Sequence, residues 1–385
     1  MSDAEEKPIL TLRTCRLYAE DVALFRPAQW LNDACISFFF EALQAAAELY
    51  FMARACHENQ TIAEGIARWL AEGIEPLSEK NEELLRCKLG LSSPACQPSA
   101  GEPASCNVTS RQEEHSEALL SLDLTEQDEA QVCSPILFVD PCVAFWVSMC
   151  TDESEVQDTL ENLHIPRRSV VVWPITDHQD PSTVGGTHWT LLIQIVCNRA
   201  VNRNATAQND YNAHDPVQLL SGYQYFHFDS IGHNCQQSRG NLAAARRLQA
   251  LLGRFVKIST STDSPPAGDH DRSDRTPIPL RCTPPQSNAS DCGVHCLLFA
   301  ERLLQLVVKK DRDFFKGKDN SGDRRSKQTT PSVDVETGPL YPELPFDVSW
   351  FSLPDLQRFE PSVLAARRRG AILLVNKLTQ RGGGC

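Results

Sequence analysis

The feature that most constrains the fold is an apolar run from Val294 to Val308, which begins two residues after Cys292. Its length and composition predict a helix that is buried on most sides. Asp291 occupies the N-cap position, so Cys292 is expected at the positive end of this helix, where peptide N–H groups and the helix dipole favour a thiolate. A thiolate is the nucleophile that acyl transfer requires. Because cysteine is among the most buried residue types, inert packing is the alternative for Cys292 taken alone.

Length, charge and cysteine content limit the number of domains, the partners and the compartment that can be expected. A chain of 385 residues, 41% of them apolar, suffices for one large domain with insertions or for two domains. The formal net charge of −13 argues against nucleic acid as the main partner. The polar, acidic first residues predict no signal peptide, and with no run of about 18 apolar residues we expect no membrane span. The 15 scattered cysteines are then expected to be reduced thiols in the cytoplasm or nucleus.

Cys292, His295 and Cys296 lie close together in the sequence and raise the question of a metal site. No second Cys/His pair follows at the spacing of a zinc finger. We therefore expect no metal and no cofactor.

Periodicity predicts both helices and strands. Asn32 or Asp33 is a suitable cap for the first long helix. Alternation in the run from His188 to Val196 indicates a strand with two distinct faces. The expected helices are 34–49, 61–74, 78–89, one from about 141, 242–255 and 361–378, and the expected strands include 168–175, 188–196, 223–229 and 256–259.

Segments of polar or mixed composition interrupt this pattern. We expect a single domain over residues 1–385, with a partly disordered insertion at 51–131 and a loop insertion at 198–220. The charged segment 309–340 is expected to be a disordered linker, and 341–385 a C-terminal segment that carries the final helix.

Chemistry-bearing side chains stand at the ends of three elements. His188 opens one predicted strand, Asp229 closes the next, and Cys292 opens the helix. If the two strands are antiparallel neighbours, His188 and Asp229 meet and supply a base and the carboxylate that orients it. Gln286, six positions before the cysteine, lies in a turn that can bring its amide towards the sulfur to form an oxyanion hole with the Cys292 N–H.

Each of these residues has an ordinary alternative. His188 suits a strand end, Asp229 a turn, and Gln286 a solvated loop. Their joint occurrence in compatible settings favours thiol chemistry over coincidence.

Four stretches carry a resemblance to a known family. They are Trp30–Asp33, Gly185–Leu192, Phe226–Ser230 and Gln286–Gly293. In them the chain resembles the Ulp/sentrin-specific cysteine proteases, and most closely the branch that removes the modifier Nedd. The resemblance implies an α+β, papain-like fold with a central mixed sheet flanked by helices and several insertions.

The resemblance also assigns roles to individual residues. It makes Cys292 the nucleophile, His188 the base, Asp229 the third member of a triad and Gln286 the oxyanion donor. It places Trp30 and Trp189 along a narrow tunnel for the Gly-Gly tail of the modifier, and it has Asp33 help to hold that tail or the globular body. Two facing indoles would exclude residues that carry a Cβ atom.

The expected activity is a thiol isopeptidase and peptidase that acts on Nedd conjugates, such as cullins, and on the Nedd precursor. A SUMO-specific protease of the same fold, a binding module without catalysis and an acyltransferase are the alternatives. We expect a monomer. The ending from Gln380 to Cys385 resembles the tail that such enzymes cleave, so a self-processed or autoinhibitory tail competes with the simpler interpretation of a flexible end.

Overall fold

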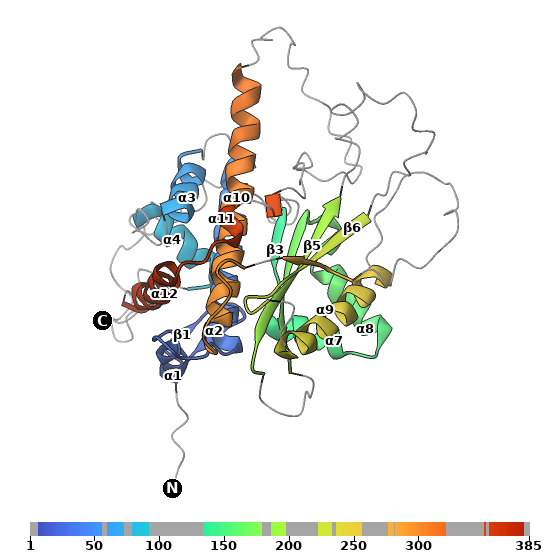
Figure 1. Cartoon of the computed structure of the whole chain (residues 1–385). Helices are drawn as coiled ribbons and strands as arrows, with labels where there is room; N and C mark the ends of the chain where they lie inside the picture. The colour runs from blue at the N-terminus through green and yellow to red at the C-terminus, as the bar shows by residue number, and fades with distance from the viewer. Residues whose placement is uncertain are drawn as a thin grey trace, which may run out of the picture.

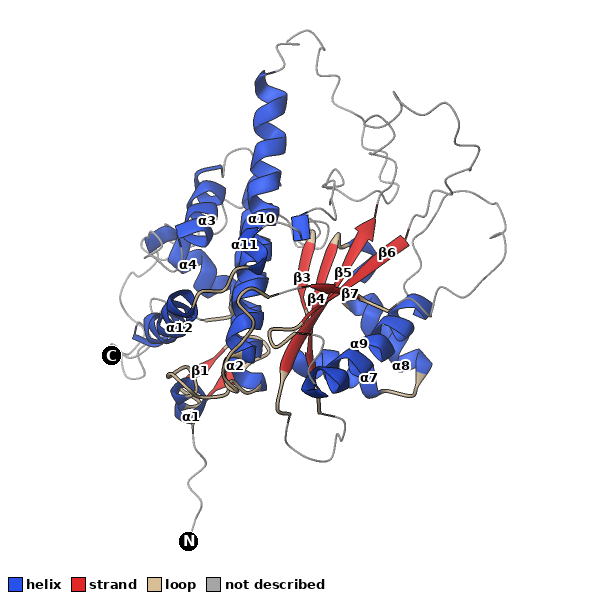
Figure 2. Cartoon of the chain, in the orientation of Figure 1, coloured by secondary structure: helices blue, strands red, loops and turns tan. Residues whose placement is uncertain are grey.

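The computed structural model describes residues 7–55, 60–72, 79–91, 134–178, 186–197, 222–232, 236–255, 276–280, 282–320, 350–351 and 354–380. A mixed five-stranded sheet lies at the centre, in the order β3-β4-β5-β6-β7 (Figure 2). The outer pairs β3/β4 and β6/β7 are parallel, whereas β4/β5 and β5/β6 are antiparallel. The strands are β3 (Ile136–Phe138), β4 (Val170–Thr176), β5 (Trp189–Cys197), β6 (Gly222–Phe228) and β7 (Ile278–Leu280).

Helices cover both faces of the sheet (Figure 1). One face packs against α2 (Asp33–Ala55) and α10 (Cys292–Asn320). Three further helices pack against these two on the side away from the sheet: α3 (Gln60–Glu72), α4 (Glu79–Lys88) and α12 (Pro361–Gln380). The other face packs against α7 (Pro141–Met149), α8 (Glu153–Asn162) and α9 (Gln236–Phe255). The short elements are β1 (Leu10–Thr11), β2 (Arg16–Leu17), α1 (Ala19–Ala23), a 3-10 turn (Ile165–Arg167) and α11 (Pro354–Gln357).

The alternation of β5 separates the two cores. Leu191, Ile193 and Ile195 are buried in the core beneath α2 and α10, and Leu192 is buried in the core beneath α9. Successive strand side chains point to opposite faces, so the two-faced strand predicted from 188 to 196 is confirmed. The expected α+β class with a mixed sheet between helices is confirmed as well.

Two expected boundaries differ from the structure. Phe51, one of several buried residues in the last turns of α2, lies inside the segment expected to be an insertion, and α3 and α4 pack into the same core. Likewise α10 continues to Asn320, although disorder was expected from residue 309. Asp311 explains part of this extension, because its buried carboxylate accepts a hydrogen bond from Tyr50 Oη at 2.7 Å. The strand expected at 256–259, the segment 198–220 and the last five residues lie outside the described residues.

Among the described residues, α2 is the one helix long and apolar enough to cross a membrane by length and composition. This helix was expected from residue 34, but not as a membrane span. Of its most apolar 18-residue window, 83% is buried inside the protein. This burial is typical of the central helix of a folded core.

Candidate active site

The main chain of His188 is fixed from two sides, directly before β5. Asp177, which follows β4, accepts hydrogen bonds at Oδ1 from Thr187 N at 2.6 Å and from His188 N at 3.1 Å. From α9, the buried Asn241 donates Nδ2 to His188 O at 2.9 Å. Gly186 precedes this pair at φ +120, where an added Cβ would lie 2.3 Å from Thr176 Oγ1. Position 186 therefore requires glycine. The carboxylate of Asp177 fixes the main chain of His188 and so the position from which its imidazole extends.

The register of β5 and β6 brings His188 and Asp229 together. Leu191 pairs with Phe228 in the antiparallel ladder, so Asp229 follows β6 at the edge where β5 begins. His188 Nε2 lies 2.8 Å from Asp229 Oδ1, and both side chains are buried. Ile231 N also donates to Asp229 Oδ1, at 3.0 Å, which holds the carboxylate in place. The predicted meeting of these two residues is confirmed.

The charge state of His188 reflects two opposing effects. Burial lowers its pKa, but the hydrogen bonds to Asp229 and Cys292 and the charges of both groups raise it, and the net pKa rises from 6.5 to about 9. Protonated imidazole is therefore favoured at neutral pH. Because Nε2 contacts Asp229, Nδ1 is the ring nitrogen left for the Cys292 thiol.

Cys292 is the first residue of α10 and is 2% exposed. The first N–H groups of a helix have no partner within it, so the start of α10 is suited to stabilise an anion that forms at the sulfur. At Gly293, an added Cβ would lie 3.0 Å from Leu31 Cβ, which shows how closely the segment before α2 approaches this helix end. The helix start and the chain around Leu31 thus form two sides of one site.

Gln286 is bonded to the residue that follows Asp229. Its main-chain N–H donates to Ser230 O at 2.7 Å, and its Oε1 accepts from Ser230 Oγ at 2.6 Å. Its Nε2 donates one hydrogen to Asn288 O at 2.5 Å. An amide nitrogen carries two hydrogens, so one N–H is left for a substrate oxygen. The structure thus ties Gln286 to the strand end that carries Asp229, while its predicted role as oxyanion donor stays a prediction.

The three residues expected to hold the substrate differ in exposure and in the partners they contact. Trp189 is half-buried and donates Nε1 to Leu31 O at 2.8 Å, and the neighbouring Trp30 is 40% exposed. The two tryptophans are therefore connected through Leu31, which follows Trp30 in the chain and accepts the hydrogen bond from Trp189. Asp33 is exposed at the start of α2 and lies beside Cys142 of α7, with 3.9 Å between Cys142 Sγ and Asp33 Oδ2. Their roles in binding stay predictions.

Asp291 lies directly before α10, as expected, but its carboxylate binds different partners from those of an N-cap. It accepts from Asn288 Nδ2 at 2.8 Å and from Arg368 Nη2 at 2.6 Å. Burial raises the pKa of Asp291, but the hydrogen bonds from Asn288 and Arg368 outweigh burial and lower it overall. Asn288 Oδ1 in turn accepts from the N–H groups of Ser290 and Asp291, both at 3.0 Å, and so shapes the turn.

Sequence reasoning missed Asp177, Asn241 and Arg368. Asp177 carried a usable signal, because a hairpin between the strands at 168–175 and 188–196 brings it beside the residues before the second strand. Asn241 and Arg368 lie on distant helices, and no spacing in the sequence relates them to the site. Within the described ranges, no group of three or more His, Cys, Asp or Glu side chains is arranged to hold a metal ion.

Comparison with known proteins identifies the segment that holds these residues. Residues 154–331 match the C-terminal catalytic domain of the Ulp1 protease family. That range includes His188, Asp229, Gln286 and Cys292, but it leaves out Trp30 and the C-terminal helix.

Three curated proteins are similar over parts of their length. The probable sentrin-specific protease 8 of Dictyostelium discoideum is 25% identical over 199 residues, which is 51% of this chain and 65% of that protein. The human sentrin-specific protease 8 is 25% identical over 178 residues, 46% of this chain and 63% of that protein. The NEDD8-specific protease 1 of Arabidopsis thaliana is 30% identical over 59 residues, 15% of this chain and 26% of that protein. The chain thus spans slightly less than two thirds of the first two relatives.

Two solved structures are similar at low sequence identity. The SUMO protease Ulp1 with its catalytic cysteine oxidised to a sulfinic acid has a TM-score of 0.35 and 12% identity, with 98% of this chain and 91% of that chain covered. The Xanthomonas campestris effector protein XopD bound to ubiquitin has a TM-score of 0.29 and 16% identity, with 59% of this chain and 90% of that chain covered.

Proposed function

We propose that this chain cleaves after the Gly-Gly tail of a ubiquitin-like modifier, because its residues 154–331 match the catalytic domain of the Ulp1 protease family. The modifier we propose is Nedd, joined to a lysine amine of a protein such as a cullin or to the short extension of its precursor. The observation that carries the proposal is the buried 2.8 Å contact between His188 and Asp229, with Cys292 at a helix start beside the imidazole.

The proposed chemistry follows from the positions of these groups. His188, as imidazolium, holds the proton that Cys292 has given up, and the thiolate attacks the carbonyl carbon of the terminal glycine. Asp229 holds the ring and stabilises the imidazolium. The imidazolium then gives its proton to the departing amine, and a water molecule activated by His188 releases the glycine carboxylate from the sulfur.

The negative oxygen of the tetrahedral intermediate needs hydrogen-bond donors other than His188. The unpaired N–H groups at the start of α10 and the remaining N–H of Gln286 Nε2 are suited to this role. Gln286 is preorganised for it by its two hydrogen bonds to Ser230, so it needs no rearrangement when charge develops.

The selectivity for glycine is proposed to come from Trp30 and Trp189. Trp189 is held by Leu31 O, and Leu31 packs closely against Gly293 at the nucleophile. A tail that passes between the indoles would reach Cys292 only if it lacked side chains. Asp33, exposed at the start of α2, is suited to contact a less buried part of the modifier.

The choice of Nedd is supported by the names of the relatives, two sentrin-specific proteases 8 and a NEDD8-specific protease. Fluorogenic conjugates of Nedd, SUMO and ubiquitin, compared as kcat/KM, test it directly. We expect Nedd to be the fastest. A higher value for SUMO would support the alternative of a SUMO protease.

A Gly-Gly vinyl sulfone probe separates catalysis from simple binding. A thiol peptidase forms a covalent adduct at Cys292, and a binding module forms none. We propose that the protein acts in the cytoplasm or nucleus. This agrees with the free thiols of the cysteines that the structure describes, such as Cys15 and Cys296.

A further inference from the structure

Arg368, in the middle of α12, is 4% exposed and reaches the turn that precedes the nucleophile. Its Nε and Nη2 donate to Asp291 Oδ1 at 3.1 and 2.6 Å, and Nη2 also donates to Ser290 O at 3.2 Å. These two residues are the last ones before Cys292 and the start of α10. One side of the guanidinium thus fixes the chain where the catalytic helix begins.

The same guanidinium also binds a different segment. Nη1 donates to Leu24 O and Arg26 O, both at 3.0 Å, and Nη2 donates to Gln29 O at 2.8 Å. This segment follows α1 and leads directly to Trp30. Three carbonyl groups that converge on one cation define the path of the chain up to the exposed indole.

We propose that Arg368 is a positioning residue that locks the turn carrying Cys292 to the loop carrying Trp30. The inference rests on the proposed function, because Trp30 matters only if a tail passes beside it. The nucleophile and Trp30 stand on segments that are more than 250 residues apart in sequence, and besides the packing of Leu31 against Gly293 it is Arg368 that joins them. Arg368 itself lies outside the part of the chain that matches the family.

The geometry requires arginine in particular. A guanidinium presents five N–H donors in a planar fork, and here they serve a carboxylate and four carbonyl oxygens. A lysine ammonium at the same position can neutralise Asp291, but its three donors cannot span both segments. Charge and geometry can therefore be separated by substitution.

The charge of Arg368 also compensates that of Asp291, one residue before the sulfur. With Arg368 removed, an uncompensated carboxylate would oppose formation of the Cys292 thiolate. The other titratable groups around the sulfur stay in place: His188 before β5, Asp229 after β6, and His295 and Cys296 in α10.

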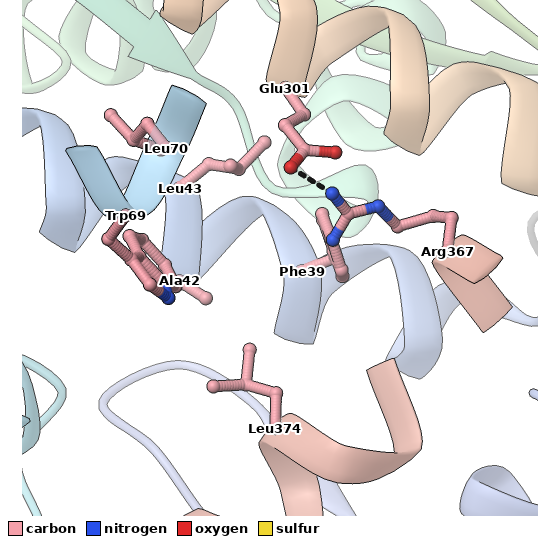
Figure 3. A pocket seen from close by; sticks show the side chains of 8 residues that line it. All are labelled: Phe39, Ala42, Leu43, Trp69, Leu70, Glu301, Arg367 and Leu374. Carbon is pink, nitrogen blue, oxygen red and sulfur yellow. Dashed lines mark ion pairs between the residues drawn. The ribbon is translucent and has the colours of Figure 1, made fainter. Parts of the chain in front are cut away.

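The neighbouring residue offers a matched control. Arg367 is 9% exposed on the same helix and pairs with the buried Glu301 in a small pocket lined by apolar side chains such as Phe39 and Leu374 (Figure 3). It contacts neither the turn before Cys292 nor the loop before Trp30 in any bond the structure records. Its loss removes a buried arginine from the same helix without touching the proposed lock.

The test compares Arg368→Met with Arg367→Met in the full chain, at a temperature where circular dichroism shows both folded. The first readout is the rate at which iodoacetamide alkylates Cys292 as a function of pH. The second is KM and kcat on the fluorogenic Nedd conjugate. For Arg368→Met we expect the alkylation midpoint to move to higher pH and KM to rise about tenfold, the size expected for lost charge-assisted hydrogen bonds. Arg367→Met should leave both near wild type.

Two further variants separate charge from geometry. Arg368→Lys should restore the alkylation midpoint but keep the raised KM, and Asp291→Asn combined with Arg368→Met should do the same. Identical midpoints and KM values for the two methionine variants would overturn the proposal. If Arg368→Met does not fold, Arg368→Lys against Arg367→Lys decides the matter, because only the first should raise KM.

Failure of the proposed function would look different. If no modifier conjugate is cleaved but alkylation still depends on Arg368, the lock on Cys292 stands and the assigned substrate is wrong. If conjugates are cleaved and neither readout depends on Arg368, the enzyme stands and the lock is wrong.

Discussion

The two halves of the candidate site are held in different ways. His188 directly precedes β5 and Asp229 directly follows its antiparallel neighbour β6, so their contact follows from the register of the two strands. Cys292 lies at a helix start whose preceding turn is tied to α12 through Arg368. The first half is set by backbone pairing, and the second depends on side chains that are distant in sequence. Substitutions should therefore damage the two halves differently, and the following experiments measure that difference.

Loss of the nucleophile should have the largest effect. Cys292→Ala should lower kcat/KM by at least about 10⁴-fold, because no other group in the site can form the acyl intermediate. Cleavage of the fluorogenic conjugate measures it, and retained binding of the uncleaved modifier shows that the site is intact. Cys296→Ala, one helical turn further and fully buried, is the control and should stay within a few-fold of wild type. Equal losses in the two variants would remove Cys292 from its role.

The sheet half is broken by Asp229→Asn. This change keeps the shape but removes the charge that stabilises the imidazolium, so kcat should fall roughly 10³-fold. Pre-steady-state rates would locate the loss in the acylation step. A variant with nearly normal kcat would show that the 2.8 Å contact is structural only.

The same contact predicts how stability depends on pH. Folding raises the pKa of His188 from 6.5 to about 9, so the folded state holds its proton more tightly than the unfolded chain. The stabilisation is fully present below pH 6.5 and is lost as the pH rises through 9, on the order of 3 kcal/mol in total. Urea unfolding from pH 6 to pH 10 measures this slope. Asp229→Asn should flatten it, and an unchanged slope would contradict the assigned cause.

Gln286 precedes Cys292 in the chain but is hydrogen-bonded to Ser230 after β6, so Gln286→Ala tests the junction of the two halves. Loss of one oxyanion donor should lower kcat about 10²-fold and change KM little. Ser230→Ala removes only the hydroxyl that positions the Gln286 amide, so a smaller loss of the same kind is expected. Steady-state kinetics on one conjugate compares the two. A loss confined to KM would assign Gln286 to binding instead.

The smallest effect is expected in the loop that leads to His188. Gly186→Ala places a Cβ 2.3 Å from Thr176 Oγ1 at φ +120, and the strain should cost about 1–3 kcal/mol of unfolding free energy. Gly232→Ala is the control, since φ is +94 there but nothing lies within 4 Å of the added Cβ. Thermal unfolding should show the larger loss at Gly186. Equal losses would mean that the backbone angle alone sets the cost.

The sequence predicted the elements that carry local periodicity. The apolar run after Cys292 and the alternation after His188 predicted α10 and β5, because burial on one face or stripe leaves its period in the chain. The meeting of His188 and Asp229 was also predictable, since consecutive strands usually pair. The limits of α2 and α10 were not, because both helices are extended past the expected ends by long-range contacts such as that between Tyr50 and Asp311.

The tertiary structure alone decided what supports the nucleophile. Asp291 has the right identity and place for an N-cap, and local rules assign its carboxylate to the helix. A guanidinium from α12 binds that carboxylate instead, since a buried charge is stabilised more by an opposite charge than by one amide. The sequence by itself therefore determined which residues can perform the chemistry, because the ends of helices and strands are set by residues close to them in the chain. Their mutual placement depends on long-range hydrogen bonds such as those of Arg368, which leave no period and no spacing in the chain.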